Sequence, residues 1–131
     1  MRKKDELDVL VPEPSEVEDV HGNKIQVPKI TWKKEVEALR ILGRLLKHLE
    51  TYLEGEQPKV AAVLQIALEK APDELTRIAA ILLEKEPTWV EQNLESDAIF
   101  KLIFPFVVNI YVKAKRNIPE PLRSLRLPLQ R

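Results

Sequence analysis

The residues of this chain that could do chemistry are few, and they are scattered. His21 and His48 are its two histidines, and neither has a second histidine or an acidic cluster at the spacing of metal ligands. Glu50, Glu54 and Glu56 gather near the end of an expected helix. Acidic residues need a pocket and shifted pKa values to transfer protons, so a solvated surface explains these three glutamates.

Other reactive groups are equally sparse. The chain has no cysteine, which excludes disulfides and thiolate metal sites. Its three glycines, Gly22, Gly43 and Gly55, are too far apart to form a loop that cradles a phosphate. The serines lie outside any nucleophile motif. We therefore expect no enzymatic activity, no catalytic residue, no bound metal and no cofactor.

Composition bounds the class of protein. The chain has 131 residues, 44% of them hydrophobic and 32% charged, and its formal net charge is zero. This balance predicts one soluble globular domain. The most apolar stretch, residues 100–112, is shorter than the roughly 20 residues that a membrane-spanning helix needs. Acidic residues near the N-terminus replace the apolar core of a signal peptide, so we expect a cytoplasmic protein.

Charge is distributed unevenly between the two ends. Residues 1–20 hold three basic and seven acidic residues, a net charge of −4, whereas residues 113–131 hold six basic and one acidic residue, a net charge of +5. The basic tail has no aromatic residue that could stack on bases, so nucleic-acid binding is not expected. The two ends could instead attract each other or a neighbouring copy. Leu125 and Leu127 give the tail the alternating pattern of a short docking peptide.

The order of apolar and turn-forming residues predicts a mainly α fold. We expect residues 1–16 to form a mobile acidic arm, residues 17–117 a single helical domain, and residues 118–131 an extended basic tail. Alternating valines and isoleucines around Gly22 and Asn23 predict a small N-terminal β-hairpin. Caps, prolines and helical periodicity predict a compact bundle of five short helices at residues 31–54, 59–70, 72–86, 88–95 and 97–116.

Local signals give further predictions. Thr31 should cap the first helix, and Thr88 with Glu91 matches a capping box that would open the fourth. Gly43 lies in the middle of the first helix, where glycine costs about 0.5–1 kcal/mol relative to alanine, so we expect close contact with another helix there. A two-stranded hairpin is marginal alone, so it must pack on the helices or pair with another chain, and a homo-oligomer is expected.

The last helix is apolar around most of its circumference. Ser96 should cap it and Pro105 should kink it. Ile99, Leu102 and Ile103 share a face before the proline, and Phe106, Val107, Ile110 and Tyr111 share one after it. Such a helix is predicted to divide its faces between the core and an interface. The candidate partner-binding residues are Phe104, Phe106, Val107, Ile110 and Tyr111, with Leu125 and Leu127 in the tail.

In layout, residues 17–116 resemble the small tail assembly chaperones of long-tailed bacteriophages. The features that carry the resemblance are the glycine-centred hairpin "DVHGNKIQVP", the following "KITWKKEVEALRILGRLL", and a run of short helices that ends in a charged tail. The resemblance implies a non-enzymatic viral chaperone in the host cytoplasm. It would coat the long, mostly helical tape measure protein and help to recruit tail tube subunits. The family has no invariant catalytic residue to carry over.

Two other classes remain open from the sequence. One is an unrelated helical adaptor or oligomeric structural subunit, which would use the same apolar surface. A DNA-binding helix-turn-helix regulator is a weaker alternative, because the third expected helix carries only Arg77 and Lys85 as basic residues.

Overall fold

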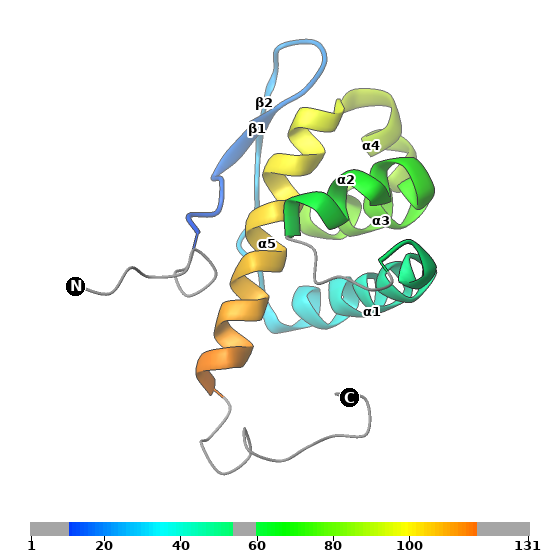
Figure 1. The fold of residues 1–131 in the computed structure, drawn as a ribbon. Helices are drawn as coiled ribbons and strands as arrows, with labels where there is room; N and C mark the ends of the chain where they lie inside the picture. The colour runs from blue at the N-terminus through cyan, green and yellow to red at the C-terminus, as the bar shows by residue number, and fades with distance from the viewer. Residues whose placement is uncertain (1–10, 54–59, 118–131) are drawn as a thin grey trace, which may run out of the picture.

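The computed structural model describes residues 11–53 and 60–117, and these form a mainly helical domain with a small N-terminal hairpin (Figure 1). The predicted fold class is confirmed. The elements, in chain order, are β1 (Glu16–Glu18), β2 (Lys24–Gln26), α1 (Trp32–His48), the 3-10 helix η2 (Glu50–Leu53), α2 (Val60–Lys70), α3 (Pro72–Leu83), α4 (Pro87–Asn93) and α5 (Ser96–Asn117). Residues 1–10 of the predicted arm and the predicted tail at 118–131 lie outside the described residues.

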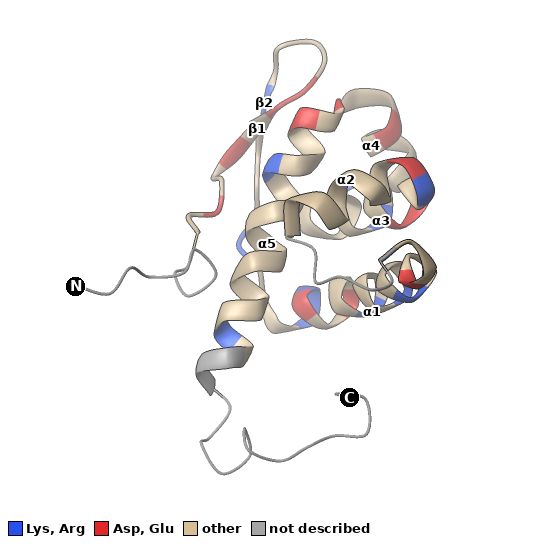
Figure 2. Ribbon diagram, viewed as in Figure 1, with Lys and Arg blue, Asp and Glu red and all other residues tan. Residues whose placement is uncertain are grey.

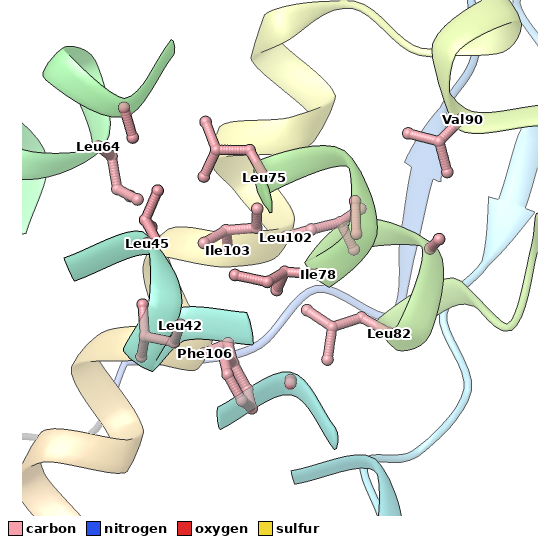
Figure 3. Packing of buried hydrophobic residues seen from close by; sticks show 14 of the residues in the cluster. Leu42, Leu45, Leu64, Leu75, Ile78, Leu82, Val90, Leu102, Ile103 and Phe106 are labelled. Carbon is pink, nitrogen blue, oxygen red and sulfur yellow. The ribbon is translucent and has the colours of Figure 1, made fainter. Parts of the chain in front are cut away.

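Helix α3 is at the centre of the domain, where it contacts each of the other four α-helices. Pro72 lies at its first position, where its missing N–H costs no hydrogen bond. The helix ends at Leu83 instead of the predicted residue 86, because Glu84 adopts a left-handed conformation with φ 60°. Apolar side chains from α1, α2, α3 and α5 converge around it (Figure 3), and Leu45, Ile78 and Phe106 are almost completely buried.

The hairpin packs on the helices. Val17 pairs with Ile25 in its antiparallel register, and the Val17 side chain is only 4% exposed. The backbone N–H of Val20 donates to the Asn93 carbonyl oxygen over 2.9 Å, which ties the turn to the end of α4. Gly22 takes the positive φ of 84° that the predicted turn requires. Of the two expected ways to stabilise this hairpin, packing on the helices is the one observed.

Asp19 organises the hairpin turn. Its Oδ1 accepts hydrogen bonds from the backbone N–H groups of His21 over 2.9 Å and of Asn23 over 2.8 Å. Desolvation acts to raise the pKa of Asp19, but the hydrogen bonds from Asn23 and His21 outweigh it and lower the pKa below its ordinary value of 3.8. The charged form of this carboxylate is therefore part of the folded turn.

Lys34 is a buried cation that joins α1 to the end of α3. It is 6% exposed, and its Nζ donates to the carbonyl oxygens of Lys29 over 3.3 Å and Leu82 over 3.2 Å. The same Nζ lies 2.8 Å from Oε2 of Glu84. A positive charge at the carboxyl end of α3 complements the helix dipole and satisfies a terminal carbonyl group.

The predicted caps and the predicted role of Gly43 have mixed outcomes. Thr31 caps α1 as expected, since its side chain accepts from the Lys34 N–H over 3.4 Å. The capping box at Thr88 is wrong, because α4 already begins at Pro87. The close helix contact at Gly43 is also wrong. Among the described residues, no atom beyond the neighbouring backbone of α1 lies within 4 Å of the position that a Cβ would occupy there.

Helix α5 continues through Pro105 as one element. Its buried side follows the i, i+4, i+7 ridge of Leu102, Phe106 and Asn109, to which Val108 and Val112 add further buried positions. The predicted face after the proline is therefore only partly right. It included Phe106, which is buried, but it also included Tyr111, which is 49% exposed.

Candidate partner-binding surface

The face of α5 opposite the buried ridge carries a row of large apolar residues. Phe100, Phe104, Val107 and Tyr111 are spaced by four, three and four residues, which places them one above another on a helix. We call these four residues the outer stripe. Phe100, Phe104 and Val107 are half-buried, and Tyr111 is exposed. Between Lys101 and Lys113 the helix carries no charged residue (Figure 2).

The predicted partner-binding residues divide between this stripe and the core. Phe104, Val107 and Tyr111 belong to the stripe, and the half-buried Ile110 lies beside it. Phe106 is 1% exposed and packs in the core, so it is not accessible to a partner in this conformation. Leu125 and Leu127 lie outside the described residues. Partner binding by the accessible residues stays a prediction.

An extended segment at residues 11–15, which we call the strap, lies along the flank of α5. The backbone N–H of Val11 donates to Asn109 Oδ1 over 2.7 Å, and Asn109 Nδ2 donates to the Val11 carbonyl oxygen over 2.8 Å. At the other end of the strap, the Ser15 carbonyl oxygen accepts from the N–H of Val27 over 2.9 Å. The strap is therefore held at both ends, and the predicted boundary between arm and domain at residue 16 falls inside β1.

An open apolar hollow of about 460 Å³ separates the strap from α5. Pro12 and Pro14 line it from the strap. The facing residues are Phe100 and Phe104 of the outer stripe, together with Lys101 and Pro105. Sequence reasoning missed this arrangement. The one available signal was Asn109, a lone amide within the most apolar stretch of the chain, which burial would oblige to find hydrogen-bond partners.

The far end of α5 is tied to the start of α1. Lys113 Nζ donates to Glu35 Oε2 over 2.9 Å, and the Glu35 side chain is largely buried. This pair places the last turn of α5 beside the first turn of α1, where Trp32 is the most exposed large apolar residue among those described. The outer stripe thus lies on a helix that is held by its buried ridge and, at Lys113, by this ion pair.

Neither of the ranges 11–53 and 60–117 contains a group of three histidine or acidic side chains that could hold a metal ion. His21 and His48 are both exposed, and His48 Nδ1 lies 3.8 Å from Glu74 Oε2. No helix within these ranges is both long and apolar enough to cross a bilayer.

Comparisons with protein-family models, with curated proteins and with solved structures found no match to this chain.

Proposed function

We propose that this protein is a non-enzymatic tail assembly chaperone of the long-tailed bacteriophage type. It binds the tape measure protein through the outer stripe of α5 and supports assembly of the tail tube in the host cytoplasm. The observation that carries the proposal is the outer stripe itself, a row of four apolar residues on a helix whose opposite face is already buried. The layout of hairpin, helices and charged tail supports the viral assignment by resemblance alone.

The spacing of the outer stripe suits a helical partner. Apolar residues that recur by four and three positions form the seam along which two α-helices pack. A tape measure protein is a long, mostly helical chain, so amphipathic helices are the surface that it presents. The stripe lacks charged residues over the three turns from Lys101 to Lys113, so it imposes little sequence preference on the helix that it binds. A chaperone that coats many successive segments needs this tolerance.

The alternative is a helical adaptor or an oligomeric structural subunit. The same observation favours it, because an apolar helix seam can also pack on the matching seam of a second copy. The two functions differ in whether the outer stripe binds a tape measure segment more strongly than it binds a second copy of this chain. A chaperone monomer exchanges self-contacts for tape measure segments, whereas a structural subunit keeps its self-contacts when such a partner is present.

Co-expression tests the proposal. A long coiled-coil reading frame is expected immediately downstream of the gene, and its product should be soluble and co-purify with this chain. The test variant carries Val107→Asp and Tyr111→Asp in the outer stripe. The matched control is Leu46→Asp, which changes an exposed apolar residue of α1. The proposal predicts that the stripe variant remains folded but loses the partner, while the control retains it. Equal co-purification of both variants would contradict the proposal.

A further inference from the structure

The side chain of Asn109 binds the backbone of the strap. One side-chain amide donates to the carbonyl oxygen of Val11 and accepts from the N–H of the same residue. This is the pattern that two residues make across an antiparallel strand pair, and it does not depend on the side chain at position 11. Asn109 is only 7% exposed, and its amide oxygen and one of its N–H groups are both hydrogen-bonded to Val11.

The rest of the strap adds a sequence requirement. Pro12 and Pro14 face Phe100, Phe104 and Pro105 across the apolar hollow. Prolines at alternate positions hold the backbone extended, and extended proline-rich segments bind aromatic-lined grooves at low entropic cost. The surface formed by Phe100, Phe104, Pro105 and Asn109, which we call the strap groove, therefore suits an apolar residue followed by Pro-Glu-Pro.

The chain contains this pattern twice. Residues 11–14 read Val-Pro-Glu-Pro, and residues 118–121 read Ile-Pro-Glu-Pro. These are the only two places where prolines stand two residues apart. Both copies begin with a β-branched residue. The second copy follows directly on α5, which ends at Asn117.

A tail cannot reach the groove of its own chain in this register. Asn109 lies about 12 Å before Asn117 along the helix axis, at a rise of about 1.5 Å per residue. Residue 118 is a single step from Asn117, and consecutive Cα atoms are about 3.8 Å apart. Ile118 therefore cannot pair with Asn109 of the same molecule, whereas Ile118 of a second molecule can.

We propose that the strap groove of one copy binds residues 118–121 of a second copy in place of its own strap. The contact is head to tail, because the groove and the tail are different surfaces. The strap is then an internal competitor. As part of the same chain it acts at an effective concentration of the order of millimolar, so exchange is favoured when copies are crowded together. The strap groove shares Phe100 and Phe104 with the outer stripe, but the proposed contact does not require the outer stripe to bind the tape measure protein.

A peptide binding experiment tests the exchange on the full chain. The probe is a fluorescent peptide of residues 117–123. The matched control is the same peptide with an N-methyl group on the backbone nitrogen of Ile118. This change removes the N–H that would donate a hydrogen bond to Asn109 Oδ1. The Val11→Pro variant removes the corresponding N–H from the strap and opens the groove. We expect at least tenfold tighter peptide binding to Val11→Pro than to the unchanged chain, and at least tenfold weaker binding of the methylated peptide. Equal binding of both peptides, or no gain in the Val11→Pro chain, would overturn the proposal.

Cysteine crosslinking gives a second readout that needs no change in the strap. Because the chain has no cysteine, two full-length variants, Lys101→Cys and Glu120→Cys, can be mixed and oxidised. Glu13 lines the same hollow as Lys101, so its counterpart Glu120 should approach Lys101 of the second copy. The expected product is a disulfide-linked dimer that forms at least fivefold more slowly when the Glu120→Cys chain also carries Ile118→Pro. Equal rates with and without Ile118→Pro would contradict the proposed contact.

Discussion

Asn109 and Val11 are separated by 98 residues in the sequence and joined by two hydrogen bonds of 2.7 Å and 2.8 Å. One residue lies in the last helix and the other in an extended segment that precedes the first strand. The pair closes the chain on itself and fixes how much of α5 the strap covers. It also gives the amide of Asn109 a role in stability that can be measured.

Asn109→Leu keeps the size of the side chain and removes both hydrogen bonds to Val11. Each bond contributes about 0.5–1.5 kcal/mol, so the free energy of unfolding should fall by roughly 1–3 kcal/mol. Val11→Ala is the matched control, because it keeps the backbone groups that Asn109 contacts. Chemical denaturation of both variants checks the prediction, and an equal or larger loss in Val11→Ala would show that side-chain packing holds the strap instead.

Lys34→Met should destabilise the domain because it leaves the Leu82 carbonyl group buried without its donor. Loss of a buried partner costs about 1–3 kcal/mol. The contribution from Glu84 is smaller, since that carboxylate is largely exposed. Lys33→Met is the control, because Lys33 is an exposed neighbour, and it should change the free energy of unfolding by no more than about 0.5 kcal/mol. Indistinguishable denaturation midpoints for the two variants would refute this role of Lys34.

Gly43→Ala should stabilise the domain by about 0.5–1 kcal/mol. The position is inside α1 and a new Cβ would meet open space, so the helix gains propensity at no steric cost. Gly22→Ala should have the opposite effect, because φ at Gly22 is 84° and alanine is strained there. Thermal melts of the two variants should shift in opposite directions, and a loss of stability in Gly43→Ala would mean that α1 is packed more closely than described.

The hairpin turn should weaken in acid. The folded-state pKa of Asp19 lies below its ordinary value of 3.8, so the carboxylate's contribution is fully present above that pH and is lost as the pH falls through the folded-state pKa. A carboxyl NMR titration should place Asp19 below 3.8, and the Asn23 and His21 amide resonances should follow the same titration. A midpoint at or above 3.8 would show that the hydrogen bonds to Asp19 do not dominate.

Several local signals in the sequence predicted the structure correctly, although the capping box at Thr88 did not. Turn chemistry at Gly22, the cap at Thr31 and the proline at the start of α3 were read correctly because each acts on its immediate neighbours. The hydrogen bonds of the buried Lys34 and Asn109 side chains could not be predicted, since their partners are backbone groups 48 and 98 residues away. A pattern of side chains does not indicate which distant backbone groups will become hydrogen-bond partners.

The predicted division of α5 into faces was only partly right for a related reason. An apolar helix shows that its surface must be covered, but not by which element. Phe106 and Tyr111 belong to the same apolar run, yet Phe106 is buried in the core and Tyr111 is exposed. The positions of the neighbouring helices, and not the run itself, determine which side of α5 is buried. The outer stripe can be identified only once the buried ridge of Leu102, Phe106 and Asn109 is known.

The most direct test of the proposed function compares Phe106→Ala with Tyr111→Ala. Phe106→Ala empties a core position and should lower the free energy of unfolding by about 3–5 kcal/mol. Tyr111→Ala should cost less than about 1 kcal/mol, yet it should weaken binding to the tape measure protein at least tenfold. The decisive measurement is that dissociation constant, determined by titration at a temperature where both variants are folded. We expect a selective loss of affinity in Tyr111→Ala, and unchanged affinity in this variant would contradict the assignment of the outer stripe as the partner-binding surface.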